Sequence, residues 1–421
     1  MQNHSSDVNI DDLPIAVIGA GVVGLSCALQ LQRQGYKVHL YDPERPGSQC
    51  SLGNAGHFAT EQVFPLACKS LLPKLPKMLF TPTSALRIRP AYFFKLLPWL
   101  WRFCINMRQR PFTRNTLALK ALNGQALRAW QCLLADDFDT HIQCNGSLLT
   151  FERTPLSRVQ ALADKYAAHG IAVEVLNKAQ VQALEPELNA NITYALYFTE
   201  VGHTASPQAL SDHLFDTLIQ AGAKYLALHV EAIQDKGSFC QLVTAGQTRA
   251  YRKVVVCTGA YSKVLCQRLG YRLPIEAERG YHYQLQTHHK VTRPIACAER
   301  QFIVTPMQQG LRLAGTVEFA GLHTPADYRR AKNLLKHGKE LVPCINEEYK
   351  QQACWQGARP SLPDSLPVIG PAPKHPNVYF ALGHQHLGLT QAAITSELIA
   401  ASINEQPTAI NLDAFCISRF Q

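Results

Sequence analysis

The sequence predicts an α/β fold that combines a parallel, Rossmann-like sheet with half-buried antiparallel strands. Three observations predict it. Buried apolar runs at 15–18 and 253–256 indicate parallel strands, and a glycine-rich turn follows the first. Another strand is expected to end at Leu382 and to lead into a second glycine-flanked turn and a helix. By contrast, 281–291 and 310–321 alternate polar and apolar residues, as half-buried antiparallel strands do.

The composition is that of a globular protein with about two domains. The chain has 421 residues, 47% of them hydrophobic, and no uncharged apolar run long enough to span a membrane. The first 13 residues lack the features of a signal peptide, so we expect a frayed tail and a cytoplasmic protein. The 13 cysteines include no Cys-x-x-Cys pair and the 16 histidines no His-Glu-x-x-His. Neither a disulfide framework nor a metal site is therefore expected.

Residues 15–42 carry a dinucleotide-binding pattern. The first strand runs into a Gly-x-Gly-x-x-Gly turn, which is followed by a helix and by a second strand, 37–41. The first glycine permits the tight turn, the second lets the backbone approach a pyrophosphate, and the third lets the helix pack closely on the strand. A carboxylate suited to the ribose hydroxyls stands about 20 residues further on. NAD and FAD both remain possible from this unit alone. The predicted contacts are Gly19, Ala20, Gly21, Val23, Gly24 and Asp42.

Two of three further segments that favour FAD lie in the first two thirds of the chain. In a FAD protein the chain after the second strand must pass along the diphosphate and the ribityl chain, and residues 48–58 are small and polar enough to do so. A strand within 224–233 is expected to cross near the adenine, ahead of the strand that ends in the turn 258–260. The residues expected to contact the cofactor here are Ser51, Asn54, Ala55, Gly56, Val230 and Gly259.

The third segment is the C-terminal return, 377–400. Its helix is expected to begin near Thr390, where free N–H groups and the positive dipole end favour the negative charge of a reduced flavin. An NAD enzyme needs no such return, whereas a flavin enzyme does. The cofactor contacts expected here are Gly383, His386, Leu387, Gly388, Leu389 and Thr390.

The chain resembles the D-amino-acid oxidase superfamily, and within it the bacterial FAD-dependent D-amino-acid dehydrogenases, including D-hydroxyproline dehydrogenase-like members. Besides the glycine fingerprint, the resemblance rests on SLGNAG (51–56), VVVCTGAYS (254–262), ERGYHYQL (278–285), WQGARPSLPDSLPVIG (355–370) and GHQHLGLT (383–390). It covers nearly the whole chain. It implies a Rossmann-like FAD-binding domain of residues 1–75, 200–270 and 350–421, interleaved with an α+β substrate domain of residues 76–199 and 271–349.

The resemblance also implies the catalytic residues. Oxidising an α-amino acid requires loss of a hydride from Cα to the flavin N5, while a guanidinium grips the substrate carboxylate through two parallel bonds. The matching arginine is Arg359, within GARP. No dedicated general base is required if the amine binds neutral. Cys354 is expected to be a free thiol rather than a covalent flavin link. The other candidate catalytic residues are Tyr281, Tyr283, Arg279 and His384.

The stretch 84–114 combines aromatic and aliphatic bulk with arginines, inside a region, 62–135, that has no Asp or Glu. Three prolines are expected to prevent one long helix. One explanation is a membrane contact, with Phe94, Trp99 and Trp101 in the acyl boundary and the basic groups on anionic head groups. A second is a helical part of the substrate domain with a solvated basic face. A nucleic-acid surface is the least favoured, because polar base-reading groups are lacking.

The sequence therefore predicts a FAD-dependent dehydrogenase of D-amino acids. Small or cyclic substrates such as D-proline or hydroxy-D-proline are suggested by the resemblance alone. The electrons are expected to pass to a quinone or another respiratory acceptor, at the cytoplasmic face of the inner membrane if the basic stretch binds lipid. The alternatives are a glycine or sarcosine-type oxidase that uses oxygen, a flavoprotein subunit without turnover of its own, and a tRNA-modifying flavoprotein.

Overall fold

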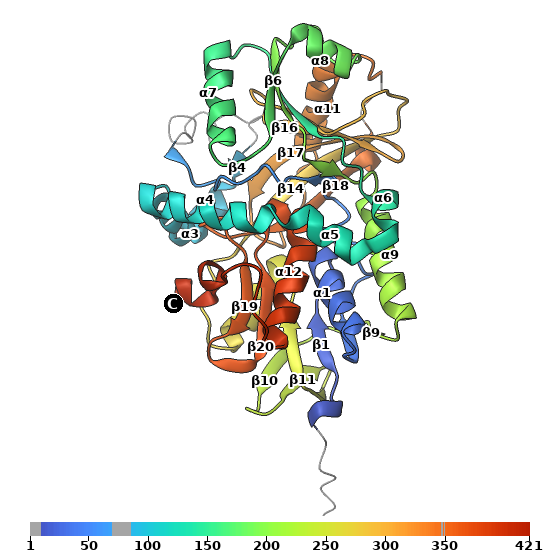
Figure 1. Cartoon of the computed structure of the whole chain (residues 1–421). Coiled ribbons are helices and arrows are strands. Elements are labelled where there is room, and N and C mark those ends of the chain that lie inside the picture. The colour runs from blue at the N-terminus through green and yellow to red at the C-terminus, as the bar shows by residue number, and fades with distance from the viewer. Residues whose placement is uncertain (1–9, 70–85, 347, 349) are drawn as a thin grey trace, which may run out of the picture.

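The structure, a computed structural model, describes residues 10–69, 86–346, 348 and 350–421, and it contains two large sheets. The first, in the lower half of Figure 1, has six strands in the order β19-β20-β13-β1-β2-β9. Neighbouring strands are parallel, except β19 with β20. The strands are β1 (Ile15–Ile18), β2 (Val38–Tyr41), β9 (Lys224–Leu226), β13 (Lys253–Val256), β19 (Val368–Ala372) and β20 (His375–Leu382).

Both faces of this sheet are buried, which explains the continuous apolar sequences of β1 and β13. Ile15 and Val17 belong to a core shared with three helices, whereas Ala16 and Ile18 belong to a core shared with a meander and a short helix. The three helices are α1 (Val22–Arg33), α9 (Pro207–Gln220) and α12 (Gly388–Ile403). The meander and its helix are β10 (Ala232–Asp235), β11 (Cys240–Thr244), β12 (Gln247–Tyr251) and α10 (Ser262–Arg268).

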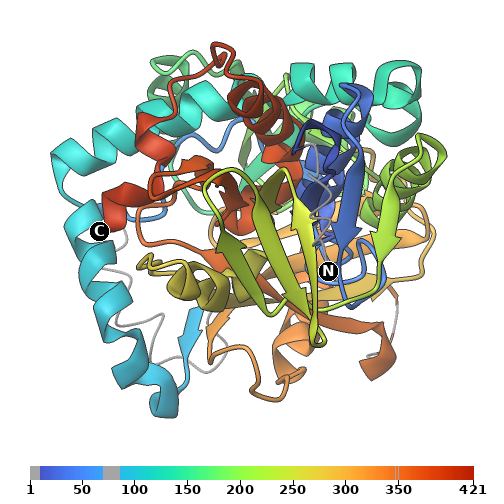
Figure 2. The ribbon, with the colours of Figure 1, turned by 90° about the horizontal axis from the view of Figure 1, so that it is seen from below.

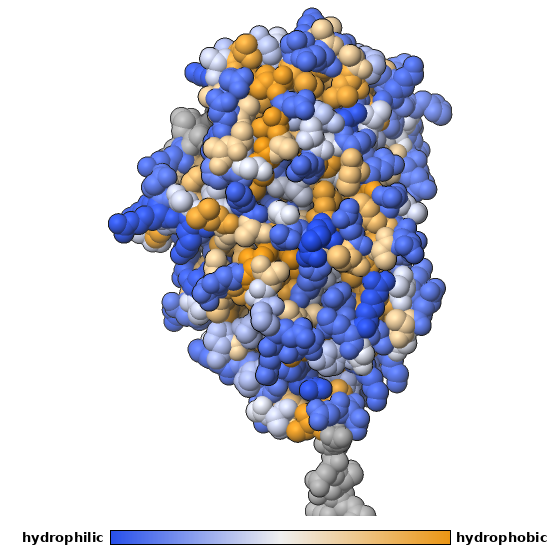
Figure 3. All heavy atoms as spheres, viewed as in Figure 1, coloured by the Kyte–Doolittle hydropathy of each residue, from blue (hydrophilic) through white to orange (hydrophobic). Residues whose placement is uncertain are grey.

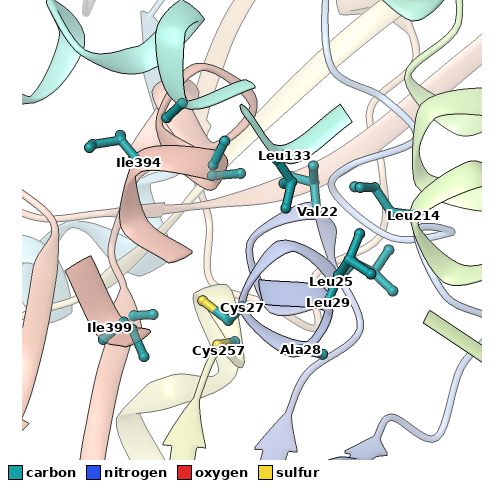
Figure 4. Close-up of a cluster of buried hydrophobic side chains, with 14 of the residues drawn as sticks. Val22, Leu25, Cys27, Ala28, Leu29, Leu133, Leu214, Cys257, Ile394 and Ile399 are labelled. Atoms are coloured by element: carbon teal, nitrogen blue, oxygen red, sulfur yellow. The ribbon is translucent and has the colours of Figure 1, made fainter. Parts of the chain in front are cut away.

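Helix α1 lies between α9 and α12. In Figure 4, Leu25 and Leu29 of α1 lie toward Leu214 of α9, while Cys27 lies beside Cys257, which follows β13. Because α12 comes from the end of the chain and α1 from its beginning, the two termini complete one core. The predicted α/β class with a Rossmann-like unit is confirmed.

The second sheet has nine strands and lies above the first domain in Figure 1. Its order is β18-β14-β17-β16-β15-β5-β7-β6, with β4 paired to β17. Its pairs are antiparallel, except β15 with β5 and β17 with β4. The strands are β4 (Leu86–Ile88), β5 (Ser147–Phe151), β6 (Val173–Asn177), β7 (Tyr194–Phe198), β14 (Glu276–Leu285), β15 (Ile295–Cys297), β16 (Phe302–Met307), β17 (Gly310–Phe319) and β18 (Cys354–Ser361).

Helices cover the outer side and the ends of this sheet. Helix α11 (Arg329–Leu341) packs on β14 and β17, so one face of these strands is turned away from the first domain. The remaining elements are β3 (His57–Phe58), α3 (Phe93–Asn106), α4 (Gln109–Asn123), α5 (Ala126–Leu134), α6 (Phe138–His141), α7 (Leu156–Ala167), α8 (Lys178–Leu184) and β8 (Gly202–His203).

Two expected domain boundaries do not match the sheets. Strand β18 pairs with β14 in the second sheet, so the boundary expected at 350 falls after Ser361. Helix α5 lies between 76 and 199 but packs on α12, and Trp130 donates from its indole nitrogen to the carbonyl of Leu389 at 3.0 Å. The reason in both cases is tertiary pairing between segments far apart in the sequence, which local patterns do not reveal.

Helices α3 and α4 stand at one edge of the molecule (Figure 2). As expected, the chain breaks between them, although Pro98 is accommodated inside α3. The projecting end where α4 begins is strongly hydrophilic (Figure 3). One of the three aromatic residues expected to be exposed here is buried instead. Trp99 is buried, with its ring centroid 5.2 Å from that of Phe319, whereas Phe94 and Trp101 are 79% and 68% exposed.

Candidate functional site

A cleft of about 660 Å³ opens at the carboxyl ends of β1, β13 and β20, where parallel sheets of this kind bind ligands. It continues along the segment after β2 and reaches β18 of the second sheet through Ala358 and Pro360. The sequence-predicted residues that line it are Gly19, Gly21, Val23, Asp42, Ser51, Asn54, Val230, Gly259, Gly383, His384, Gly388 and Leu389.

The glycine turn has the geometry that each of its glycines predicts. Gly21 caps α1 in an extended conformation, and the first N–H of the helix, on Val22, donates to the Ser51 hydroxyl at 2.9 Å. Gly24 does not line the cleft, because it packs against the turn: a Cβ there would lie 1.8 Å from the Gly19 carbonyl oxygen. Ala20 is also outside the lining, and its N–H donates to the Asp42 carboxylate at 2.7 Å.

The segment 50–56 crosses from the cleft to the second sheet. Arg312 of β17 donates to the carbonyl oxygens of Leu52 and Asn54 at 2.9 and 2.5 Å. Ala55 and Gly56 therefore lie outside the cleft lining. A Cβ on Gly56 would lie 2.4 Å from the carbonyl oxygen of Thr204, so this glycine lets the segment pass close to the chain that follows β8.

The C-terminal turn contributes fewer contacts than expected. Helix α12 begins at Gly388 rather than near Thr390, and Gly388 and Leu389 line the cleft. Thr390 instead accepts a hydrogen bond from the N–H of Ala59 at 3.0 Å, and Leu387 is buried in the core. The predictions that Leu387 and Thr390 contact the cofactor are not supported by this geometry, because both side chains are used inside the protein.

Residues of two segments were missed in the sequence. The chain after β9 and helix α10 close the end of the cleft opposite the second sheet, and Arg268 donates to the carbonyl of Glu231. Only Val230 was singled out there, since these residues carry no motif. The missed lining residues of these segments are Leu228, His229 and Glu231 after β9, Tyr261 directly before α10, and Val264, Leu265 and Arg268 in α10.

Arg359 does not itself line the cleft, although its neighbours Ala358 and Pro360 do. It lies on the face of the second sheet that is turned toward the first domain, where its charge acts on Cys50, a lining residue, and on His386. It stands directly opposite Glu278 on β14, and its Nη1 is 3.4 Å from the Glu278 carboxylate. A Cβ on Gly280 would lie 2.4 Å from the guanidinium carbon of Arg359. The guanidinium therefore packs where a side chain at position 280 would otherwise be. Gly280 and Glu278 were not predicted. With four-fifths of its side chain buried, Arg359 is a preformed cation beside the cleft.

Strand β14 carries Tyr281, Tyr283 and Arg279 on its opposite face, away from Arg359. The two tyrosines do share a face, but that face packs under α11, and both side chains are fully buried. The Tyr281 hydroxyl donates to Glu318 at 2.6 Å, and the Arg279 guanidinium lies 3.5 Å from the same carboxylate. Their expected roles at the substrate and the flavin are therefore corrected. Alternation along β14 places residues 279, 281 and 283 on the α11 face when 278 and 280 share the face of Arg359.

The two histidines of the C-terminal turn differ from expectation: His386, and not His384, lies near Arg359. His384, expected to be catalytic, directs its Nε2 to the Thr395 hydroxyl of α12 at 3.0 Å, and burial lowers its pKa to about 3. His386 bonds Gln62 at 2.7 Å and lies within electrostatic range of Glu278 and Arg359. Burial lowers its pKa as well. His386 is thus the histidine nearer the Arg359 chamber, which is defined as the three adjoining residues Arg359, Glu278 and Gly280.

A buried polar cluster adjoins this chamber. His57 Nε2 lies 3.6 Å from the Glu61 carboxylate, and the charges of His203 and His386 both act on His57. Burial lowers the pKa of His57 to about 3 and raises that of Glu61 to about 8. Both groups are therefore neutral near pH 7: His57 is an unprotonated imidazole and Glu61 a protonated acid.

Glu61→Gln is expected to remove a pH dependence of stability. Glu61 has an ordinary pKa of 4.5 and a pKa of about 8 in the folded state, so its contribution is full below about pH 4.5 and is lost as the pH rises toward 8. The stability of the native protein relative to Glu61→Gln should therefore fall by about 1.4 kcal/mol per pH unit across this window. Urea unfolding at pH 5.5, 6.5 and 7.5 measures the difference. A difference that stays constant with pH would contradict the assignment, and exposed Glu174→Gln is the control.

No group of three or more His, Cys, Asp or Glu side chains capable of holding a metal occurs in the part of the chain that the structure describes. In the same part, no helix is long and apolar enough to cross a membrane. Cys354 lies on the α11 face of the second sheet, opposite Tyr283, and its thiol is directed to the carbonyl oxygen of Lys350 at 3.8 Å.

The cleft and its glycine turn are those of a FAD-dependent oxidoreductase. The family model described as DAO, FAD dependent oxidoreductase, matches residues 14–402, and the chain belongs to this family. FAD is its cofactor. The residues fit this group, because the N-termini of α1 and α12 both open on the cleft, Asp42 lines it, and a Cβ on Gly21 would meet only Ser51, at 3.4 Å.

The chain is similar to amino-acid oxidases and dehydrogenases over almost its full length. It is 31% identical to a D-amino-acid oxidase of Bradyrhizobium diazoefficiens, with 96% of this chain and 98% of that protein covered. It is 29% identical to D-amino acid dehydrogenase 2 of Pseudomonas aeruginosa, with 94% and 96% covered. The structure of L-proline dehydrogenase from P. horikoshii matches with a TM-score of 0.74 at 15% identity, covering 97% of both chains, and shares the fold.

Proposed function

We propose that this protein catalyses the FAD-dependent oxidative deamination of D-amino acids. The observation that carries the proposal is Arg359, a largely buried guanidinium that packs on Gly280 and lies within electrostatic range of Cys50 in the lining of the cofactor cleft. A carboxylate is the one group that every α-amino acid brings, and a guanidinium binds it through two parallel hydrogen bonds. The D-amino-acid specificity is supported by the names of the relatives at 24–31% identity.

The protein's part in this reaction is positioning. Arg359 would fix the substrate carboxylate, and with it the orientation of Cα toward the cleft. FAD, when bound, takes up the hydride from Cα at N5. His57, Glu61 and His386 adjoin the chamber and are buried, so the substrate amine would bind next to groups that water does not reach. His57 and Glu61 are also neutral near pH 7 and bring no charge to the amine. Loss of the hydride from a neutral amine would leave an iminium, and water would hydrolyse the C=N bond to give a 2-oxo acid, with the nitrogen leaving as ammonium or, for a cyclic substrate, remaining on the chain as an amine.

Substrate and acceptor are proposed more narrowly on the resemblance of the turn 383–388. Small or cyclic D-amino acids, including D-proline and hydroxy-D-proline, are the proposed substrates, and a quinone or another respiratory acceptor takes the electrons. A glycine or sarcosine oxidase that uses oxygen is the alternative outcome of the following experiment.

The test mixes the holoprotein anaerobically with a panel of D- and L-amino acids, glycine and sarcosine, and follows the absorbance of the flavin. Bleaching by D-amino acids is expected, with D-proline among the fastest. Bleaching by glycine or sarcosine alone would replace the proposal by the alternative, and no bleaching by any amino acid would refute both. Reoxidation is then compared between oxygen and a soluble quinone analogue, and faster reoxidation by the quinone is expected.

We also propose that α3 places the enzyme on an anionic membrane. Its outward face carries Phe93, Phe94, Leu97 and Trp101, all exposed, and exposed basic residues at Lys95, Arg108, Arg110 and Arg114 flank it. Apolar side chains in the acyl boundary and basic groups on head groups reinforce each other.

The double variant Phe94→Glu, Trp101→Glu is expected to reduce co-sedimentation with phosphatidylserine vesicles several-fold at low salt, because each change replaces apolar contact with repulsion. Leu117→Glu adds one such charge at an exposed apolar position of α4 and is expected to have less than half the effect of the double variant. Equal binding by the double variant and the native protein, or no binding by the native protein, would refute the membrane contact.

A further inference from the structure

The Arg359 chamber contains a second charged group that the proposed reaction does not use. Glu278 is 5% exposed and faces Arg359 across the β14–β18 pair. Among the described residues, Arg359 is its only ion-pair partner. The groups that face these two from other elements are His386, from the turn before α12, and Cys50, from the segment after β2. On β14 itself, His282 also lies within electrostatic range of Arg359 and of Arg312, and burial lowers its pKa to about 3, so it is uncharged. The chamber thus holds one guanidinium and one carboxylate, and neither His386 nor Cys50 adds another fixed cation.

This arrangement gives the chamber a charge preference. A substrate carboxylate can bind the free nitrogens of Arg359 while Glu278 holds Nη1 from the side, since a guanidinium has five donors. The chamber then remains negative at Glu278. A second carboxylate on the substrate would meet this charge at short range in a largely dry site, whereas an ammonium would be attracted to it.

We propose that Glu278 selects substrates by side-chain charge, so that neutral and cationic D-amino acids bind at Arg359 and acidic ones are excluded. This inference rests on the proposed role of Arg359 as the carboxylate clamp. It differs from a purely structural role of Glu278, in which the carboxylate only orients the guanidinium. A structural role would change the affinity for all carboxylates by the same factor, whereas selection changes the ratio between them.

The experiment titrates three unreactive ligands of similar length into the holoprotein and follows the flavin spectrum. Butanoate carries no distal charge, succinate a negative one, and 4-aminobutanoate a positive one. The native protein is expected to bind 4-aminobutanoate at least about tenfold more tightly than succinate. Glu278→Gln, which keeps the shape and removes the charge, is expected to bring the two dissociation constants within about threefold of each other.

Two further variants serve as controls. Glu278→Asp keeps the charge and should retain the order of the three ligands even if Glu278→Gln loses FAD. Glu174→Gln removes an exposed carboxylate from β6, at the far edge of the same sheet, and should behave as the native protein does.

The proposal is overturned if the native protein binds succinate as tightly as 4-aminobutanoate, or if Glu278→Gln weakens all three ligands equally. Its failure differs from failure of the proposed function. If acidic and basic D-amino acids bleach the flavin equally well, the function stands and the selection fails. If the ligands bind in the expected order but no D-amino acid bleaches the flavin, the selection stands and the function fails.

Discussion

Arg359→Lys is expected to lower kcat/KM for D-amino acids by about 100-fold while leaving FAD bound. Lysine keeps the positive charge but offers a single ammonium instead of a planar fork, so it cannot make two parallel bonds to a carboxylate. The surroundings of the guanidinium also favour arginine over lysine. Gly280 leaves room for a flat guanidinium, and Glu278 holds it from the side at 3.4 Å, so an ammonium at the end of a flexible chain would not be fixed in the same place.

Anaerobic stopped-flow reduction of the flavin measures this effect without involving the electron acceptor. The dissociation constant of the substrate should rise, and the rate of reduction at saturation should fall because Cα is no longer held in one orientation. Arg158→Ala, which removes an exposed arginine from α7, is the matched control and should be unaffected. Unchanged reduction in Arg359→Lys would mean that the carboxylate binds elsewhere.

The sequence was sufficient where the structure depends on residues close together in the chain. The unit from β1 to Asp42 is such a case, because strand, turn, helix and acid all follow within about 30 residues. Gly19, Gly21 and Asp42 line the cleft as predicted, and Gly24 packs the helix on the turn.

The sequence was insufficient where the answer depends on which face of an element is covered. Periodicity shows that Tyr281 and Tyr283 share a face of β14, but the choice of face is made by α11, which packs there from residues 329–341. Alternation then places Glu278 and Gly280 on the other face of β14, beside Arg359. Their pairing with Arg359 joins residues about 80 positions apart, and neither spacing nor composition records such a contact.

The histidines of the C-terminal turn show the same limit on a smaller scale. His384 and His386 are two residues apart, a spacing that would place them on one face of a strand. Gln385 between them has a φ of +52° and begins a 3₁₀ turn, so the chain reverses and the two rings diverge. His384 then faces α12, and His386 faces Gln62. A single left-handed residue was enough to exchange the expected roles.

Gly24→Ala is expected to abolish stable FAD binding and to destabilise the protein by at least about 1–3 kcal/mol. The added methyl would lie 1.8 Å from the Gly19 carbonyl oxygen and 3.2 Å from the Cys257 Cβ, so α1 would have to move away from both strands. Its N-terminus, capped at Gly21, opens on the cleft. A shift of α1 therefore removes the N–H groups that face the cofactor diphosphate, in addition to disturbing the core.

Gly35→Ala is the matched control, because Gly35 follows the other end of the same helix and a Cβ there meets nothing within 4 Å. Its φ of +90° makes alanine strained, at a cost of about 1 kcal/mol, without moving the helix start. The flavin absorbance relative to protein, and the melting temperature with and without added FAD, separate the two variants. Gly35→Ala should melt earlier but remain yellow. Gly24→Ala should be colourless, with a melting temperature that added FAD does not raise. A yellow Gly24→Ala protein would mean that α1 tolerates displacement, and that its contact with Gly19 does not set the geometry of the cofactor site.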